Sequence, residues 1–353
     1  MLNNRAAYMT AIQKIELTSC PVQEVGPGKV LLEIAYVGVC GSDAHFFESG
    51  MRKGKYFELP FLLGHEASAT VVSVGEGVEN LVPGDRVVIE PQQTCGVCEF
   101  CKSGHYNMCP EVAFPSVPPY DGMLRNYMTF PAHLCYKLPE KVSLLEGALV
   151  EPLAVGLSAA ERGNVRLGQT VVILGTGAIG LTTVLACKAR GAAKIIVVDL
   201  FQNRLDCAVS MGATDAINAK ETDPVAEVMR LTDGAGADVV FETAGNVKTA
   251  SMTVDYVKRC GTIVMVGNVN GETPIRFMDL MYKEGEIKTI YRYKNNFKTA
   301  IAAIASGSID VKEMISRVFP FEQTQEAFEC SLKDKMNVVK LVIDVAGYQE
   351  TGV

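Results

Sequence analysis

Four cysteines in one short segment form the densest cluster of metal-binding side chains in the sequence. Cys95, Cys98, Cys101 and Cys109 lie within fifteen residues and have the spacing C-x2-C-x2-C-x7-C. Four thiolates, each with its sulfur roughly 2.3 Å from the zinc ion, would complete a tetrahedral site and leave no position for a substrate. We interpret the cluster as a structural zinc site. The alternatives are free thiols and an iron–sulfur cluster, whose bacterial pattern has about three residues before the last cysteine.

Three separate fragments carry a second set of possible metal ligands. They are residues 39–45 (VCGSDAH), 64–66 (GHE) and 150–153 (VEPL). A cysteine, a histidine and a carboxylate can hold a catalytic zinc ion that keeps one position open for substrate. A cysteine between valine and glycine also fits a core position, however, and a glutamate before proline also fits a turn. Residue types and spacing alone leave both interpretations open.

A glycine-rich sequence indicates a nucleotide site. Residues 169–175 (QTVVILG) predict a strand buried on both faces. Residues 175–180 (GTGAIG) match G-x-G-x-x-G where a helix is expected to begin, which is the context this motif requires. Gly175 would permit the tight turn, Gly177 the approach of a pyrophosphate, and Gly180 close packing of helix on strand.

Further residues around this motif predict the cofactor. Asp199 ends the next expected strand, nineteen residues past the last glycine. A carboxylate there accepts hydrogen bonds from the ribose hydroxyls and repels the 2′-phosphate of NADP, which predicts NAD. Ala178 and Ile179 begin the helix whose N-terminus would face the phosphates. Arg204 would stack on the adenine or is simply a surface charge, and Val266, at the end of a later strand, completes the predicted cofactor contacts.

The order of strands and helices predicts two domains. The first 150 residues or so contain short β runs separated by glycine and proline, as in a barrel or sandwich. After residue 167 strands and helices alternate, which is typical of a doubly wound parallel sheet. We therefore predict an α/β protein with a mainly β catalytic domain at 1–153, which includes a zinc lobe at 92–110, a Rossmann domain at 154–288, and a return to the first domain at 289–353.

Composition is that of an ordinary globular protein. The chain has 353 residues and a formal net charge of -7, which argues against nucleic acid or an anionic membrane as partner. No segment reaches the ~18 consecutive apolar residues of a membrane span, and the first residues contain no apolar run of signal-peptide length. A cytoplasmic location is therefore expected. Six isolated cysteines are interpreted as small buried hydrophobes: Cys20, Cys135, Cys187, Cys207, Cys260 and Cys330.

Taken together, the motifs resemble the zinc-dependent medium-chain alcohol dehydrogenases, and most closely their sorbitol (polyol, L-iditol 2-) dehydrogenase branch. The resemblance covers nearly the whole chain. It implies a GroES-like catalytic domain together with the Rossmann domain, and a homotetramer. Its landmarks are GVCGSDAH (38–45), LGHEA (63–67), VPGDRV (82–87), the four-cysteine lobe, EGALVEPLAVG (146–156), GTGAIG (175–180) and YRYKN (291–295).

The resemblance assigns a catalytic zinc site to the three fragments. Cys40, His65 and Glu66 match the zinc ligands, and Glu151 matches a carboxylate that binds the metal or holds its water. A thiolate and a carboxylate would offset the two charges of zinc, with the histidine neutral. One catalytic and one structural ion would give two zinc ions per chain.

Other matched residues would move the proton and recognise the substrate. Ser42 and His45 match a proton relay that leads from the substrate hydroxyl to solvent. Arg292 and Tyr293 match residues that lie near substrate hydroxyls in polyol dehydrogenases, and a purely apolar alcohol would leave them unsatisfied. Phe46 stands where sorbitol dehydrogenases often carry a tyrosine, so one substrate hydrogen bond is missing.

The sequence thus predicts oxidation of a secondary hydroxyl of a polyol, such as sorbitol or xylitol, to a 2-ketose with hydride transfer to NAD. One alternative is the same chemistry on 2,3-butanediol or L-threonine. Another is a catalytically silent NAD-binding protein with a structural or regulatory role, which would hold one zinc ion rather than two.

Overall fold

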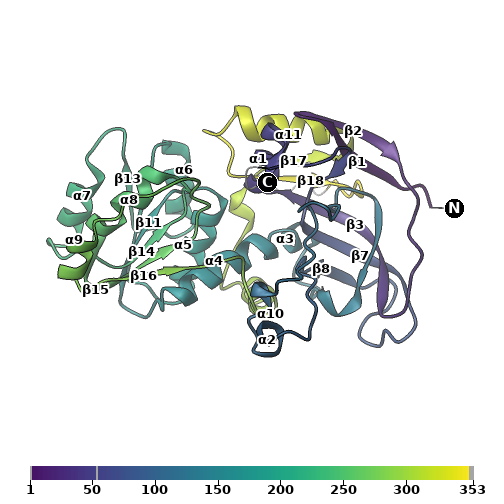
Figure 1. Ribbon diagram of the computed structural model, residues 1–353, viewed down its shortest axis with the longest axis horizontal. Coiled ribbons are helices and arrows are strands. Elements are labelled where there is room, and N and C mark those ends of the chain that lie inside the picture. The colour runs from purple at the N-terminus through teal and green to yellow at the C-terminus, as the bar shows by residue number, and fades with distance from the viewer. Residues whose placement is uncertain (1, 53–54, 350–353) are drawn as a thin grey trace. The chain divides into compact units, whose positions relative to one another are not determined.

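The computed structural model describes residues 2–52 and 55–349, which fold into two compact units (Figure 1). The first unit combines three stretches of chain, Met1–Glu151, Phe297–Ala305 and Ile315–Val353. The second combines Pro152–Asn296 and Ser306–Met314. These units are groups of residues in dense contact. The boundaries predicted at 153 and 288 remain a prediction of where separately folding domains begin and end.

Three strands from distant parts of the chain lie side by side in the largest sheet of the first unit. β3 (Lys29–Val39) pairs antiparallel with β7 (Glu66–Val74) on one side and with β18 (Lys340–Asp344) on the other. The register sets Gly38 opposite Glu66 of β7 and opposite Val342 of β18. Most of β3 is buried because it is rich in Val, Leu and Ile, which suit a sheet covered on both faces.

The other elements of the first unit extend this sheet and cover it. The order of the large sheet is β10-β8-β7-β3-β18-β17, with β9 also paired to β3, and two smaller sheets have the orders β2-β1-β6 and β4-β5. The strands are β1 (Arg5–Ala11), β2 (Lys14–Ser19), β4 (Met51–Arg52), β5 (Lys55–Tyr56), β6 (Phe61–Leu62), β8 (Arg86–Ile89), β9 (Tyr127–Pro131), β10 (Cys135–Lys137) and β17 (Ile315–Pro320). The helices are α1 (Gly41–Ser49), α2 (Glu99–Lys102), α3 (Leu144–Gly147), α10 (Phe297–Ala305) and α11 (Thr324–Lys333).

The second unit is built on a six-stranded parallel sheet. Its strand order, β13-β12-β11-β14-β15-β16, is the 3-2-1-4-5-6 order of a Rossmann fold. The strands are β11 (Thr170–Leu174), β12 (Lys194–Asp199), β13 (Asp215–Asn218), β14 (Ala237–Glu242), β15 (Val257–Met265) and β16 (Glu286–Thr289). The helices are α4 (Val150–Arg162), which begins within the first unit, α5 (Ala178–Ala189), α6 (Gln202–Ser210), α7 (Pro224–Leu231), α8 (Val247–Tyr256) and α9 (Phe277–Tyr282).

The predicted fold class is confirmed in both parts: a parallel Rossmann sheet and a mainly β unit. The Rossmann strands form because apolar, β-branched runs such as TVVIL and KIIVVD are buried on both faces by the helices between them. Among the helices described here, none has the length and hydropathy that crossing a bilayer requires.

The prediction that the six isolated cysteines are buried holds for only two of them. Cys135 and Cys187 are buried, Cys20, Cys207 and Cys330 are half-buried, and Cys260 is exposed. The residue has a φ of 57° and lies in β15 where the pairing with β14 shifts its register between Ala237 and Val239. A bulge of this kind turns a side chain out of the sheet, and the sequence pattern does not reveal it.

We predict that Gly180→Ala destabilises the second unit. A Cβ at residue 180 would lie 2.0 Å from the carbonyl oxygen of Gly175, so β11 and α5 would have to separate. Overpacking of this kind costs about 1–3 kcal/mol, which should lower the thermal unfolding midpoint by several degrees. Gly177→Ala is the matched control, because a Cβ there meets only Arg204 Nη1, at 4.0 Å. Equal midpoints for Gly180→Ala and Gly177→Ala would contradict the prediction.

Candidate functional site

The predicted catalytic zinc ligands converge in the first unit. The sulfur of Cys40, a ring nitrogen of His65 and a carboxylate oxygen of Glu66 all lie within 4.8 Å of one another. His65 and Glu66 are buried and Cys40 is half-buried. Ligands around one zinc ion at roughly 2.0–2.3 Å have a similar spacing, so this donor set fits zinc.

Sheet register explains why these residues meet. Glu66 is the first residue of β7 and lies opposite Gly38 in β3, and Cys40 follows the end of β3 directly. The chain then turns into α1, and the carbonyl oxygen of Cys40 accepts hydrogen bonds from the N–H groups of Asp43 (3.0 Å) and Ala44 (2.9 Å). The start of the helix therefore fixes the backbone that carries the thiol.

Asp43 orients His65 and was not identified from the sequence. Its carboxylate is fully buried, and its Oδ2 lies 3.1 Å from His65 Nδ1. The same carboxylate accepts hydrogen bonds from the N–H of Gly64 (3.1 Å) and the hydroxyl of Ser116 (2.6 Å). A carboxylate behind a metal-binding histidine fixes the ring and leaves the other nitrogen for the metal. The motif GSDAH contains this aspartate, but only the fold shows that it faces a histidine twenty-two residues away.

The electrostatics of His65 are set by its anionic neighbours. Burial by itself disfavours the charged ring, but the negative charges of Asp43 and Cys40 outweigh burial, and the pKa of His65 is raised well above its usual value. A metal ion would have to displace the proton that these anions favour, because histidine binds metals as a neutral ring.

Lys340 is the second residue that sequence reasoning missed. Its side chain is 2% exposed, forms an ion pair with Glu66 Oε2 and donates a hydrogen bond to the carbonyl oxygen of Val39 at 3.1 Å. Burial opposes its charge, but Glu66 and Cys40, with a smaller effect of Glu151, outweigh burial and raise the pKa of Lys340. The sequence offers no local signal for this contact, because Lys340 follows Val39 by 301 residues.

The remaining predicted catalytic residues, Glu151, Ser42 and His45, differ in burial and in how near they lie to the metal group. Glu151 is buried near the start of α4 and lies within electrostatic reach of Lys340, but it is not part of the Cys40, His65 and Glu66 group. The hydroxyl of Ser42 donates to Cys40 Sγ at 3.4 Å. The side chain of His45 is 59% exposed, with Nδ1 3.9 Å from Glu48. Ser42 is thus beside the metal group and His45 faces solvent.

The structure does not support Phe46 as a substrate contact. The ring has no exposed surface and packs in the core of the first unit against Phe57 and Phe61, with ring centroids 6.4 and 5.6 Å away. Arg292 and Tyr293 belong to the second unit. Tyr293 is buried, and Arg292 is partly buried over the ring of Tyr291, so their role toward a substrate remains a prediction.

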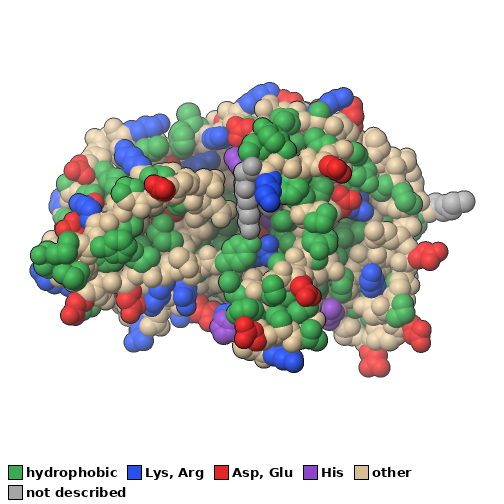
Figure 2. Space-filling model, viewed as in Figure 1, with side chains coloured by type: hydrophobic (Ala, Val, Ile, Leu, Met, Phe, Trp, Pro, Cys, Tyr) green, Lys and Arg blue, Asp and Glu red, His purple; other side chains and the backbone are tan. Residues whose placement is uncertain are grey.

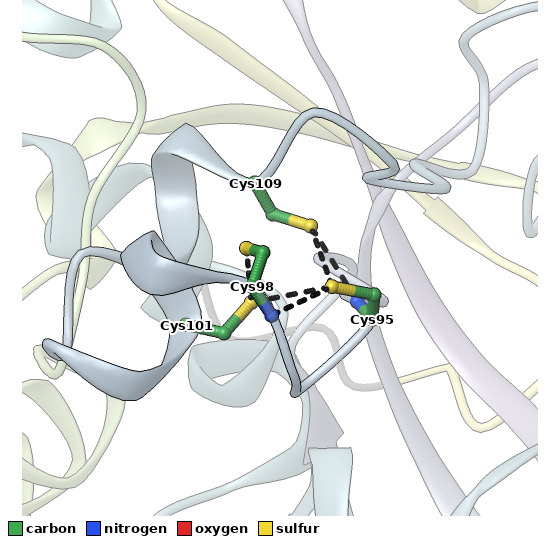
Figure 3. Close-up of side chains that lie close together, drawn as sticks. All are labelled: Cys95, Cys98, Cys101 and Cys109. Carbon is green, nitrogen blue, oxygen red and sulfur yellow. Dashed lines mark hydrogen bonds between the residues drawn. The ribbon is translucent and has the colours of Figure 1, made fainter.

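The four-cysteine cluster, like the catalytic group, has the geometry of a zinc site. Figure 3 shows the four sulfur atoms facing a common centre, with separations of 3.5 Å (Cys98–Cys101), 3.6 Å (Cys95–Cys109) and 4.0 Å (Cys95–Cys101). These distances exclude disulfides, and tetrahedral zinc with bonds of roughly 2.3 Å requires sulfurs about 3.8 Å apart. Backbone N–H groups of Val97 and Cys98 lower the pKa of Cys95 to about 7, which favours the metal-binding thiolate.

A buried carboxylate connects this lobe to the rest of the first unit. Glu90, just after β8, accepts hydrogen bonds from Tyr106 of the lobe at 2.7 Å and from Tyr136 of β10 at 2.8 Å. Burial raises the pKa of Glu90, although both tyrosine hydroxyls oppose that shift. The lobe is therefore held by a polar contact as well as by its cysteines.

The glycine-rich loop follows β11 and has the predicted geometry. Gly175 has a φ of 97°, and a Cβ there would lie 2.8 Å from Ala244. Gly177 precedes α5 and has open space where its Cβ would be, which is the room that an approaching phosphate needs. Ala178 and Ile179 form the first turn of α5 and are half-buried. This cradle fits a dinucleotide.

The residues predicted to contact the rest of the cofactor surround this loop. Asp199 ends β12, and its Oδ2 accepts hydrogen bonds from the N–H (2.7 Å) and the hydroxyl (2.8 Å) of Thr176. Arg204 lies over the ring of Phe201, 5.4 Å from its centroid, and burial lowers the pKa of Arg204. Val266 directly follows β15. All therefore lie at or beyond the carboxyl ends of parallel strands, where such sheets bind ligands.

We predict that Asp43→Asn weakens metal binding by the Cys40, His65 and Glu66 group by roughly 10–100-fold, the usual cost of losing such an orienting carboxylate. Competition with a chromophoric zinc chelator measures this loss. Asp310→Asn is the control, because that carboxylate is exposed and accepts a hydrogen bond only within its own turn, from the N–H of Lys312. Wild-type zinc affinity in Asp43→Asn would refute the orienting role.

Comparison with known proteins identifies the family. Residues 26–140 match the alcohol dehydrogenase GroES-like domain, and residues 178–306 match the zinc-binding dehydrogenases. Sorbitol dehydrogenase from Bacillus subtilis is 39% identical over 97% of each chain. An oxidoreductase/dehydrogenase of unknown specificity from Escherichia coli has a TM-score of 0.94 and 41% identity over 98% of this chain and 100% of that one. The structure of 2R,3R-butanediol dehydrogenase from Bacillus subtilis has a TM-score of 0.88 and 30% identity over 97% of this chain and 99% of that one. The chain therefore belongs to the zinc-dependent medium-chain alcohol dehydrogenases, in their polyol dehydrogenase branch.

Proposed function

We propose that this dehydrogenase oxidises a secondary hydroxyl of a polyol, such as sorbitol or xylitol, to a 2-ketose and transfers the hydride to NAD. The observation that carries the proposal is the convergence of Cys40, His65 and Glu66 into one donor group, in which His65 and Glu66 are buried and Cys40 is half-buried. The glycine-rich loop with Asp199 supplies the nucleotide site that such a reaction needs.

Zinc held by this group would polarise the substrate hydroxyl, and bound NAD would accept the hydride. The chain itself supplies positions and proton transfer. Asp43 holds His65, and the start of α1 holds Cys40. Ser42 lies beside the thiol and is the first acceptor for the substrate proton. His45, whose side chain is exposed, would pass that proton to solvent.

We infer a preference for NAD from Asp199. Its carboxylate lies at the end of β12, where the ribose of a bound dinucleotide is expected, and would repel a 2′-phosphate. The neighbouring Arg204 is directed to the ring of Phe201 and opposes that repulsion only in part. We propose two zinc ions per chain, one in the Cys40 group and one in the four-cysteine cluster, and a cytoplasmic location.

The substrate class rests on relatives and on two side chains. Sorbitol dehydrogenase from Bacillus subtilis is more similar to this chain than 2R,3R-butanediol dehydrogenase from the same organism, at 39% against 30% identity. Arg292 and Tyr293 carry hydrogen-bond donors of the kind that binds the hydroxyls of a polyol. Oxidation of 2,3-butanediol is the second candidate, because that relative has the same fold over nearly its whole length.

A homo-oligomer is supported by an apolar surface on the second unit. Phe277, Met278, Met281 and Tyr282 of α9 are 56–70% exposed. Figure 2 shows hydrophobic side chains gathered where α9 lies in Figure 1. In the described sheet the nearby β16 is an edge strand, whose free backbone groups can pair with another chain. We propose that a second copy of this chain covers this surface, within the tetramer that the family resemblance implies.

We predict that the wild-type protein oxidises pentitols or hexitols with NAD, more efficiently than with NADP, and contains two zinc ions per chain. Cys40→Ser should abolish turnover, lose one zinc ion and retain NAD affinity. Cys98→Ser should lose the other ion and lower the thermal unfolding midpoint. Absorbance of NADH and metal analysis measure these outcomes. Oxidation of butanediol without any polyol activity would reverse the substrate proposal, and full activity of Cys40→Ser would remove the catalytic assignment.

We also predict that Met281→Glu splits the oligomer into smaller species, because a charge would be buried at the proposed contact. Light scattering coupled to gel filtration gives the mass. Met336→Glu is the control, since Met336 is similarly exposed (56% against 59%) but lies in the first unit. An unchanged mass for Met281→Glu would show that the α9 surface is not the contact.

A further inference from the structure

The side chain of Lys340 is nearly inaccessible to solvent and ends at the proposed metal group. Lysine is among the residues that are almost never fully buried unless paired. Here the ammonium has two partners, Glu66 Oε2 and the carbonyl oxygen of Val39 at 3.1 Å. The first partner is a proposed metal ligand, and the second directly precedes another, Cys40.

The backbone is shaped to admit this ion pair. Gly38 lies opposite Glu66 in the β3–β7 register. A Cβ at residue 38 would lie 2.1 Å from Glu66 Oε2 and 3.1 Å from Lys340 Cε. Any other residue at this position would push the carboxylate or the lysine out of place. Gly38 has an ordinary strand conformation, so the missing side chain and not backbone freedom is what the site requires.

Lys340 pairs with one carboxylate oxygen of Glu66, Oε2, and the same carboxylate belongs to the donor group with Cys40 and His65. The ammonium also balances negative charge in a buried group that contains a thiol and a carboxylate. Removal of one member of a buried ion pair is strongly destabilising, because the remaining charge has no partner.

We propose that Lys340 is a positioning residue that holds Glu66 in place and supplies its counter-charge until zinc binds. This inference rests on the proposed function, since it takes Glu66 as a zinc ligand. Without zinc, Lys340 provides the only cation that we find paired with Glu66 among the described residues. Bound zinc would supply a second positive charge.

The consequence is a dependence of stability on zinc that Lys340 controls. When Lys340 is replaced by methionine, the metal-free protein contains Glu66 without a cation. Zinc then restores the lost charge balance, so the stabilisation gained on zinc binding should grow. If Lys340 had only a structural role, its replacement would lower stability equally with and without zinc. The difference between the two zinc responses therefore isolates the proposed role.

The test compares thermal unfolding midpoints of metal-free and zinc-loaded protein. For Lys340→Met we expect the metal-free midpoint to fall by roughly 6 °C or more, and the zinc-induced rise to exceed that of wild type by several degrees. Lys283→Met is the matched control. Lys283 is also partly buried, but its hydrogen bonds go to the backbone carbonyls of Val254 and Val257, at 2.7 Å each. The unfolding midpoint of Lys283→Met should therefore fall equally in the metal-free and the zinc-loaded protein. Cys40→Ser reports the zinc response of the four-cysteine cluster alone.

A double variant keeps the test decisive if Lys340→Met does not fold. Lys340→Met/Glu66→Gln removes both charges, so it should fold and regain most of the metal-free stability, but should respond to zinc no more than Cys40→Ser does. A zinc response of Lys340→Met equal to that of wild type would overturn the role of Lys340 and leave the proposed function standing. If zinc raises the unfolding midpoint of the wild-type protein no more than that of Cys40→Ser, both the role of Lys340 and the proposed function are overturned.

Discussion

β3 pairs with β7 on one side and with β18 on the other, and the register of these pairs brings the metal group together. Gly38 lies between Glu66 of β7 and Val342 of β18, and Cys40 directly follows the last residue of β3. A shift of one residue in the β3–β7 pairing would turn Glu66 to the opposite face of the sheet, and the same shift in the β3–β18 pairing would turn Lys340 away from it. The chemistry therefore depends on backbone hydrogen bonds made by residues that contact no ligand.

The two metal groups differ in what holds them. The four cysteines lie in one short segment and belong to a lobe with few core residues, so a bound ion would supply much of its stability. The Cys40 group is anchored by strands and by buried partners, Asp43 behind His65 and Lys340 behind Glu66. A bound ion would strengthen the first site, whereas strands and buried side chains hold the second in place by themselves. This contrast agrees with a structural role for the first and an exchangeable, substrate-facing role for the second.

Sequence reasoning succeeds here where a signal is local. GTGAIG after an apolar strand identified the nucleotide loop, and C-x2-C-x2-C-x7-C identified a metal cluster, because each motif is completed within a few residues. Asp43 and Lys340 were missed because their significance lies in partners that only the fold supplies, twenty-two residues away for Asp43 and far along the chain for Lys340. Phe46 was linked to the substrate site because sorbitol dehydrogenases often carry a tyrosine at this position, but α1 turns its ring into the core. Alternating burial along a short helix is set by packing, which a motif does not encode.

The late position of β18 has a consequence for biosynthesis. Lys340 is translated 301 residues after Val39, and at 5–20 residues per second the ribosome needs roughly 15–60 s to cover that interval. During that time β3 and β7 can pair with each other, but the carboxylate of Glu66, at the start of β7, has not yet met the ammonium of Lys340. Under the proposed zinc site, an ion bound before β18 is synthesised would supply the counter-charge that Lys340 later provides, so the order of folding and the binding of metal would be linked through this lysine.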